Sequence, residues 1–135
     1  SPPMNFVACR YDSTQQSLTG NGFAYPVGDA LARLLAPQEG RLTLGVRPED
    51  LVLHEGPNGR AIAATVYVME QLGRELLVNA QVGDTLVRAY APATASLEAG
   101  QQVWLDFEPE TLHLFDGESE VTVISGSRVA GGQAA

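Results

Sequence analysis

Lysine is absent from this sequence: all eight basic residues are arginine. A Walker A phosphate-binding loop needs a lysine on the β- and γ-phosphates, and Schiff-base catalysis needs a lysine amine. Neither chemistry is available to this chain. Because no nucleophile paired with a base is visible either, we expect no catalytic and no cofactor-binding residues here.

Cysteine occurs once, as Cys9, so no disulfide can form within the chain, and a reducing cytoplasm fits best. Cys9 has no base near it in the sequence, and we expect a small buried residue of an early strand rather than a nucleophile. Long apolar runs are also missing, since none approaches the ~18 residues that span a bilayer. The first residues, SPPMN, lack the regions of a signal peptide and are typical of the middle of a longer chain.

Positive charge and aromatic residues are scarce. Sixteen acidic residues against eight arginines give a net charge of −8, and only 7% of the residues are aromatic. An acidic chain repels phosphate backbones and anionic lipid surfaces, and single-strand binding by an OB fold needs a basic groove with stacking rings. The composition therefore argues against nucleic acid as a partner.

Turn residues and alternating patterns are abundant. Fourteen glycines and eight prolines, with 44% hydrophobic residues, are typical of an all-β protein with many turns. Apolar residues alternate with polar or small ones in four runs that predict strands: 42–46, 61–70, 76–80 and 103–107. One segment differs, because Asp29 to Ala36 combines strong helix formers with a stop at Pro37 and predicts one short helix.

Three dipeptides mark tight turns, in which glycine supplies the positive φ that hairpins require: Asn21-Gly22, Asn58-Gly59 and Gly83-Asp84. We predict that Asn58-Gly59 joins residues 51–53 and 62–68 into a hairpin. The last residues, 125–135, are rich in glycine, serine and alanine and predict a flexible tail.

The chain contains an internal repeat. Eight residues recur in the same order 61 positions later: Leu42, Leu44, Val46, Pro48, Glu49, Leu51, Leu53 and Gly56 match Val103, Leu105, Phe107, Pro109, Glu110, Leu112, Leu114 and Gly117. Each copy is an alternating strand, a Pro-Glu corner and a short apolar strand, since proline cannot donate to a ladder. We interpret the copies as β-units that complete one another's barrels, in a tandem of small OB-like barrels.

Four motifs resemble those of a known family. Residues 44–51, LGVRPEDL, resemble the "LGIRPEHL" signature of maltose-type sugar importer ATPase subunits, and residues 1–6, SPPMNF, resemble the segment that joins the two domains there. Residues 70–73, EQLG, and 112–116, LHLFD, are similar to the family's "EQLG" turn and closing "HLFD". The motifs follow the family's order. Two departures are Asp50, where the family often has histidine, and the unfamiliar stretch 25–38.

The resemblance implies a fold of tandem OB-like barrels of the TOBE, or MOP-like, type. It implies one regulatory domain over residues 1–124, made of two interlocked OB-like units, the second formed by roughly residues 97–124 with strands from 60–91. The ATPase domain, with ATP and magnesium, lies outside this chain. The implied function is regulation and dimer stabilisation in an ABC importer of sugars, polyols or glycerol-phosphate-like solutes, on the cytoplasmic face of the cell membrane. The implied partners are a second copy, the ATPase domain, the permease subunits and a cytoplasmic regulatory protein.

Eight positions are candidates for regulation or subunit contact: Phe6, Gly45, Arg47, Pro48, Glu49, Glu70, Gly73 and Trp104. Arg47 and Glu49 flank Pro48, and they either stabilise the corner or form a surface contact. The second Pro-Glu pair favours the structural role for Glu49 and leaves Arg47 the less explained residue.

Gly45 and Trp104 stand out among the candidates, because Gly45 is not repeated in the second copy and Trp104 breaks the alternation of its strand. Gly45 aligns with Asp106, so the fold itself does not require glycine there, which favours a packing contact of the first unit. Trp104 is out of phase with Leu105 and either binds a protein partner or covers the open end of the second barrel. Gly73 is a simple turn glycine.

Metal binding has no support in the sequence. His54 and His113 have no companion at metal-ligand spacing, and the acidic residues of 108–120 lack the loop pattern of a calcium site. The alternative function is a stand-alone domain that binds an oxyanion or a sugar. In a chain without lysine, anion capture would depend on backbone N–H groups and hydroxyls.

Overall fold

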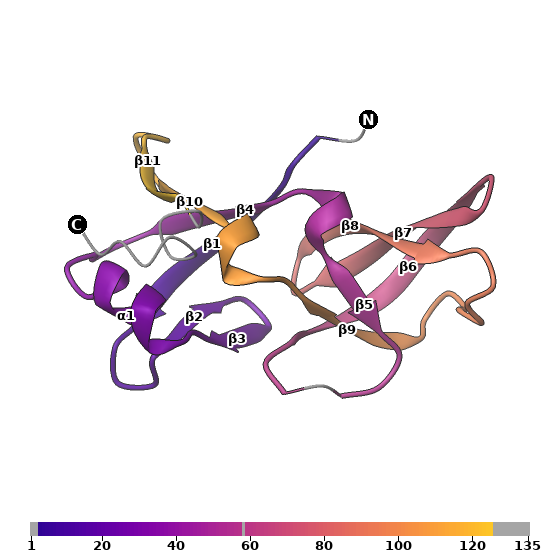
Figure 1. Ribbon diagram of the computed structural model, residues 1–135, viewed down its shortest axis with the longest axis horizontal. Coiled ribbons are helices and arrows are strands. Elements are labelled where there is room, and N and C mark those ends of the chain that lie inside the picture. Colours follow the sequence, from indigo (N-terminus) through magenta and orange to yellow (C-terminus); the bar gives the residue numbers. More distant parts are fainter. Residues whose placement is uncertain (1–2, 58, 126–135) are drawn as a thin grey trace.

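The computed structural model describes residues 3–57 and 59–125, and Figure 1 shows its two sheets side by side. In this part of the chain the backbone forms eleven β-strands, one α-helix and two short 3-10 helices. The prediction of an all-β fold of OB-like units with one short helix is confirmed.

The strands and helices follow one another along the chain as β1 (Asn5–Asp12), β2 (Ser17–Gly20), β3 (Phe23–Pro26), α1 (Asp29–Leu35), β4 (Leu42–Val46), η1 (Pro48–Asp50), β5 (Val52–His54), β6 (Ile62–Leu72), β7 (Glu75–Val82), β8 (Thr85–Pro92), β9 (Gln102–Asp106), η2 (Pro109–Thr111), β10 (His113–Asp116) and β11 (Thr122–Ser125).

Each sheet combines strands from distant parts of the sequence. The first sheet, on the left in Figure 1, has the order β11-β10-β4-β1-β2-β3, and the second has the order β5-β9-β6-β7-β8. All neighbouring strands are antiparallel. Because β10 and β11 return to the sheet of β1–β4 after β5–β9 have formed the other sheet, neither sheet is one continuous segment of the chain.

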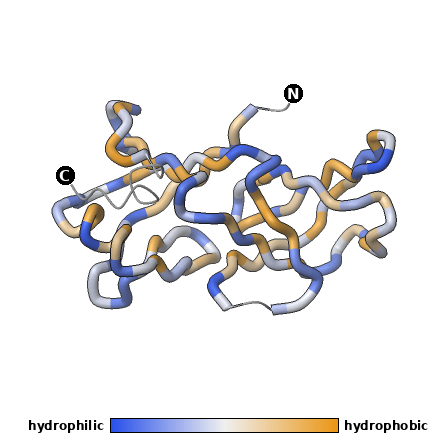
Figure 2. The backbone as a smooth tube through the Cα atoms, viewed as in Figure 1, coloured by the Kyte–Doolittle hydropathy of each residue, from blue (hydrophilic) through white to orange (hydrophobic). Residues whose placement is uncertain are grey.

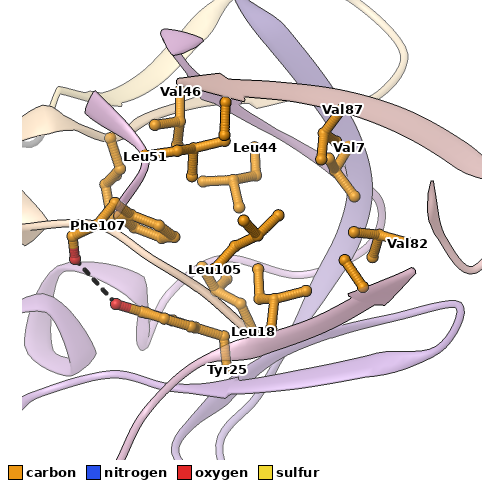
Figure 3. Packing of buried hydrophobic residues seen from close by; sticks show 14 of the residues in the cluster. Val7, Leu18, Tyr25, Leu44, Val46, Leu51, Val82, Val87, Leu105 and Phe107 are labelled. Carbon is orange, nitrogen blue, oxygen red and sulfur yellow. Dashed lines mark hydrogen bonds between the residues drawn. The ribbon is translucent and has the colours of Figure 1, made fainter. Parts of the chain in front are cut away.

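The buried side chains of both sheets form one apolar core. Figure 2 shows apolar and polar residues succeeding each other along the strands, as expected when one face of each sheet is buried. Figure 3 shows side chains of both sheets around one centre: Val7, Leu18, Leu44, Val82, Val87 and Leu105. Burying each of these contributes on the order of 1.5–3 kcal/mol. Cys9 lies in the same core, and its burial raises the pKa of the thiol to about 12, as fits a structural residue.

Two of the three predicted tight turns are confirmed, and one is wrong. Gly22, with a φ of 85°, joins β2 to β3, and Gly83, with a φ of 58°, joins β7 to β8. The predicted hairpin around Gly59 does not form, because β9 lies between β5 and β6 and pairs with both. β5 thus pairs with β9, which begins 40 residues after the start of β6, instead of with β6 itself. Asn58 lies outside the described residues.

The predicted helix and tail are each corrected by one residue. Helix α1 ends at Leu35 rather than Ala36, and its N-cap is Gly28. Leu31 and Leu35, one turn apart, are buried, so the helix packs one face onto the core. Ser125, assigned to the tail, belongs to β11, where it lies opposite His113; residues 126–135 are outside the described residues.

Candidate functional site

The two Pro-Glu corners lie where the chain crosses between the sheets. Pro48 begins η1, and the chain passes there from β4 in the first sheet to β5 in the second. Pro109 begins η2, and the chain passes there from β9 in the second sheet to β10 in the first. We call residues 45–49 the first corner and residues 106–110 the second corner.

The strands beside the corners pair reciprocally. β4 pairs with β10, where Leu44 lies opposite Leu114. β9 pairs with β5, where Leu105 lies opposite Leu53. Because Leu44 and Leu105 are equivalent in the repeat, and their partners are equivalent too, these two pairings are the same contact formed twice. Each repeat therefore contributes one strand to each sheet.

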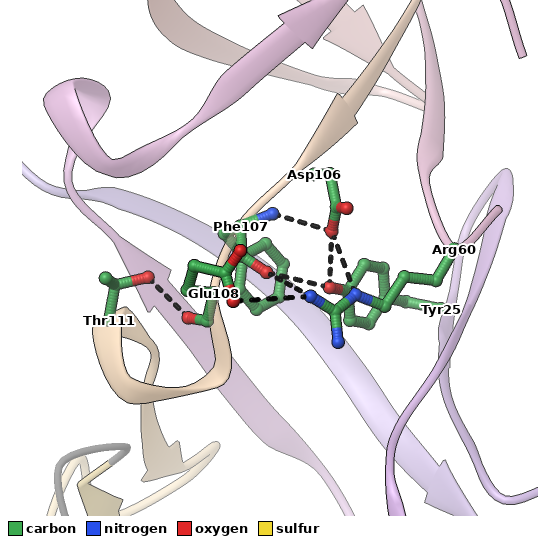
Figure 4. Close-up of polar contacts among 6 residues, drawn as sticks. All are labelled: Tyr25, Arg60, Asp106, Phe107, Glu108 and Thr111. Carbon is green, nitrogen blue, oxygen red and sulfur yellow. Dashed lines mark hydrogen bonds and ion pairs between the residues drawn. The ribbon is translucent and has the colours of Figure 1, made fainter. Parts of the chain in front are cut away.

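The second corner is held by a polar cluster around Asp106 (Figure 4). Its Oδ1 accepts hydrogen bonds from the Tyr25 hydroxyl at 2.6 Å and from the Arg60 Nε–H at 3.2 Å. The same oxygen accepts the N–H of Phe107 at 2.7 Å. Arg60 also donates to the Phe107 carbonyl at 3.3 Å and lies 3.8 Å from a carboxylate oxygen of Glu108. The charge of Asp106 is thus compensated by three donors.

Tyr25 joins this corner to the first sheet. It lies on β3, is only 2% exposed, and stacks on Phe107 with ring centroids 4.5 Å apart and an interplanar angle of 13°. Its hydroxyl also lies 3.0 Å from the Phe107 carbonyl oxygen. Burial, the largest cause, and the hydrogen bond to Asp106, the next largest, raise the pKa of Tyr25 far above its usual value. The hydroxyl therefore keeps its proton and remains a donor. An edge strand of one sheet is therefore anchored to the corner of the other.

The first corner has apolar contacts where the second has charges. Gly45 occupies the position equivalent to Asp106, and a Cβ there would lie 2.6 Å from the Met4 sulfur and 2.9 Å from a Phe115 ring carbon. Real Cβ contacts are essentially never this close, so glycine makes room for both side chains. Phe6, opposite Gly45 in the ladder, contacts Phe115 edge-on with centroids 5.9 Å apart. The packing contact predicted for Gly45 is what the structure contains.

Arg47 and Glu49 are exposed at the first corner, while Pro48 between them is buried. Within the described part of the chain, neither the Arg47 guanidinium nor the Glu49 carboxylate forms a hydrogen bond or an ion pair. The turn is closed by the backbone instead, with the Asp50 N–H donating to the Arg47 carbonyl at 2.9 Å. The corner thus holds its shape without either charged side chain.

Two grooves flank Phe6, whose side chain is 54% exposed. One, of about 330 Å³, is lined by Phe6, Thr43, Phe115 and Glu120. The other, of about 310 Å³, lies between the N-terminal residues and β8 and is lined by Pro3, Met4, Asn5, Phe6, Asn79, Leu86 and Arg88. An exposed aromatic side chain between two grooves is typical of a protein contact.

The structure brings Phe6, Gly45, Arg47, Pro48 and Glu49 together, but it places the other candidates elsewhere. Glu70 is exposed near the end of β6, and Gly73, with a φ of 61°, forms the β6–β7 turn. Trp104 is half-buried on β9, between His54 of β5 and Ala63 of β6. Three separate surfaces therefore carry the signature positions.

Four residues that organise this region were not predicted from the sequence: Tyr25, Arg60, Asp106 and Asn5. The first three come from a loop and two strands whose proximity depends on the non-local sheet order, so no spacing in the sequence indicates them. One signal was present: the repeat aligns a charged Asp106 with Gly45, and a charge inside an apolar strand requires a partner.

In residues 3–57 and 59–125, no three His, Cys, Asp or Glu side chains are grouped so that they could hold a metal ion. No helix of the described residues has both the length and the apolar character needed to cross a bilayer.

Two family models match the chain. The model of the TOBE domain matches residues 44–115, and the model of the MalK OB fold domain matches residues 1–51. The two matches overlap at the first corner.

Curated relatives are similar over most of this chain. The xylose/arabinose import ATP-binding protein XacK of Haloferax volcanii is 37% identical over 105 residues, which cover 74% of this chain and 27% of that protein. The sn-glycerol-3-phosphate import ATP-binding protein UgpC of a Ruegeria species is 32% identical over 133 residues, covering 96% of this chain and 33% of that protein. The sulfoquinovosyl glycerol transport ATP-binding protein SmoE of Agrobacterium fabrum is 27% identical, covering 91% and 34%. The chain thus spans about a third of the length of these relatives.

A solved structure has the same fold. The cytoplasmic molybdate-binding protein ModG superposes with a TM-score of 0.60 and 16% sequence identity, covering 84% of this chain and 96% of that one. At this identity the likeness is one of fold alone.

Proposed function

This chain belongs to the TOBE domain family, and we propose that it is the C-terminal regulatory and dimer-stabilising domain of an ATP-binding subunit of an ABC importer. The parent protein couples ATP hydrolysis to the uptake of a sugar, a polyol or a glycerol-phosphate-like solute. ATP and magnesium are bound by the ATPase domain outside this chain, and the chain itself performs no catalysis.

One observation carries the proposal. The two family matches follow each other over residues 1–51 and 44–115, on a chain that spans about a third of relatives named as import ATP-binding proteins. A regulatory third attached to a catalytic remainder is the simplest arrangement consistent with these lengths.

The proposed mechanism is mechanical. Because each repeat contributes one strand to each sheet and both sheets share one core, the two units move together. Such a body, in contact with its copy in the second subunit, holds two ATPase domains near each other while their nucleotide sites open and close. A regulatory protein that binds one arrangement more tightly than the other shifts the population toward it.

The partners follow from this mechanism. They are a second copy of the chain, the preceding ATPase domain, the permease subunits through that domain, and a cytoplasmic regulatory protein. The complex lies on the cytoplasmic face of the membrane. The exposed first corner, with Phe6 and Arg47, is the surface we assign to contact with another protein.

The first experiment is the intact mass of the native chain in its source cell, detected with an antibody to this domain. We expect a species well above 14.3 kDa, with a lysine-containing phosphate loop upstream of Ser1. Light scattering then compares the full-length protein with a version that ends before Ser1. We expect the full-length protein to remain dimeric without nucleotide and the shortened one to dissociate. A native species of 14.3 kDa would contradict the proposal.

The alternative of a stand-alone ligand-binding domain rests on fold alone. A groove of about 420 Å³, lined by Gly22, Ala63, Ala64, Thr65, Gln81, Gly83 and Gln102, is where a neutral polar ligand would be sought. Isothermal titration with molybdate, sulfate and sugars tests it. We expect no heat of binding, and a saturable signal from any of these ligands would favour the alternative.

A further inference from the structure

Residues 4–6, which we call the lead-in segment, are held by contacts to both sheets. Their backbone enters β1 and pairs with β4, with Asn5 opposite Val46 and Phe6 opposite Gly45. These pairings belong to the first sheet. The side chain of Asn5 reaches Arg88 of the second sheet, so the lead-in segment contacts both sheets.

Asn5 acts on β8 as a short strand would. Its Nδ2–H donates to the Arg88 carbonyl at 2.8 Å, and its Oδ1 accepts the Arg88 N–H at 2.8 Å. β8 is an edge strand of the second sheet, so within the described residues no strand lies beside these backbone groups of Arg88. A carboxamide is the side-chain group that offers one donor and one acceptor in the spacing of a peptide bond. The pair therefore requires a carboxamide side chain, which Asn5 supplies.

The residues on either side of Asn5 are fixed on the first sheet. Met4 lies over Gly45, where the missing side chain leaves space for its sulfur. Phe6 contacts the ring of Phe115 on β10. Gly45 accommodates Met4 and Phe115 together, so any side chain at this position would displace one of them.

We propose that the lead-in segment is a latch that fixes the orientation of the preceding domain relative to both sheets, with Asn5 as its positioning residue. The latch rests on the proposed function, because it requires a domain before Ser1. A polypeptide that precedes Met4 leaves the β-domain in a direction set by contacts to β4, β8 and β10. Without the Asn5 pair, the segment is held by the first sheet alone.

The test uses the full-length protein and the variant Asn5→Ala, with Asn79→Ala as matched control. Asn79 accepts a hydrogen bond from the Arg88 side chain at 3.3 Å and leaves the backbone of Arg88 untouched. Hydrogen exchange of the β8 amides measures the pair itself. We expect the Arg88 N–H to exchange about three- to tenfold faster in Asn5→Ala, and at the wild-type rate in the control. An unchanged rate in Asn5→Ala overturns the latch.

Orientation is measured by spin-label distances between the preceding domain and the exposed position 98 in the variant Glu98→Cys, in a background without other accessible cysteines. Cys9 is buried and does not need replacing. We expect the distance distribution to broaden in Asn5→Ala and not in Asn79→Ala, and equal widths would overturn the proposal. ATP hydrolysis by the wild-type protein is measured separately. If the distribution broadens but the protein hydrolyses no ATP, the latch is supported and the proposed function is refuted. If the protein hydrolyses ATP but the distribution does not broaden, the proposed function is supported and the latch is refuted.

Discussion

The two corners have the same backbone and opposite chemistry. Both are a strand, a Pro-Glu 3-10 turn and a second strand, in the same register 61 residues apart. At the second corner Asp106 and Glu108 are compensated by Tyr25 and Arg60. At the first corner the equivalent positions are Gly45 and Arg47, the one covered by Met4 and Phe115 and the other exposed.

This difference separates the two tasks that a corner can have. The second corner uses the carboxylate of Asp106 within the molecule, where it joins β3 of the first sheet to β9 of the second. The first corner gets its shape from the backbone and from apolar packing, so its charged side chains remain available to other proteins. The two repeats therefore share one backbone path but differ in side chains. Those of the second corner stabilise the fold, and the charged ones of the first corner are free to contact another protein.

The largest effect on this comparison is expected from Tyr25→Ala, which removes a buried ring and the donor to Asp106. Replacing a large buried aromatic side chain by alanine costs about 3–5 kcal/mol. Urea unfolding of the chain measures the loss. Tyr67→Ala is the matched control, since Tyr67 is 58% exposed and should change stability by less than about 0.5 kcal/mol. Equal losses in both variants would show that the second corner is no anchor.

The next effect is expected at the first corner. Gly45→Ala places a Cβ against Met4 and Phe115, and such overpacking costs about 1–3 kcal/mol. Gly56→Ala serves as control, because a Cβ at Gly56 meets no atom of the described residues within 4 Å. Thermal unfolding of both variants distinguishes them. If Gly45→Ala is as stable as Gly56→Ala, Met4 and Phe115 do not pack tightly against position 45, and the assigned role of Gly45 is wrong.

Of the two corners, only the second is expected to contribute to the pH dependence of stability, in addition to the loss that the buried Cys9 thiol, with its pKa raised to about 12, causes in every variant. The pKa of Tyr25 is raised by burial and by Asp106, whereas in the unfolded chain it is about 10. Stability from the protonated hydroxyl is therefore complete below about pH 10 and is lost as the pH rises further, because only the unfolded chain releases the proton. Urea unfolding between pH 8 and pH 11 measures this loss. In Tyr25→Phe the loss should be smaller, and an identical pH dependence would contradict the assignment.

The smallest effect on stability is expected from Arg47→Ala. Arg47 is exposed and its guanidinium has no partner within the described residues, so the free energy of unfolding should change by less than about 0.5 kcal/mol. In the parent complex we expect altered assembly or regulation, measured by light scattering and by ATP hydrolysis. Arg74→Ala, an exposed arginine of the β6–β7 turn, is the control. Equal effects of the two variants on assembly would remove the first corner from the contact surface.

Much of the fold was predictable because local patterns indicate it. Alternation of apolar residues predicted β4, β6, β7 and β9, and glycines predicted the turns at Gly22 and Gly83. The hairpin at Gly59 was the failure: its turn signal is genuine, but the strands on either side both pair with β9. Turn chemistry is local, whereas the choice of a strand partner depends on the whole core.

The candidate site was predictable in part for the same reason. Motif positions indicated Phe6, Gly45 and Arg47, and the structure places them together at the first corner. No pattern indicated that Tyr25 reaches Asp106, 81 residues away, or that Asn5 reaches Arg88, 83 residues away. These contacts form only after both sheets are assembled.

By itself, the sequence determined the all-β class, the repeated corner and the chemistry that this chain lacks, because composition, period and turn residues act within a few residues of each other. Only the tertiary structure decided which strands pair, which of the two corners is held by a polar cluster and which by apolar packing, and how the lead-in segment is held. Those outcomes depend on contacts between residues far apart in the chain, which exist only where two sheets bury one common core.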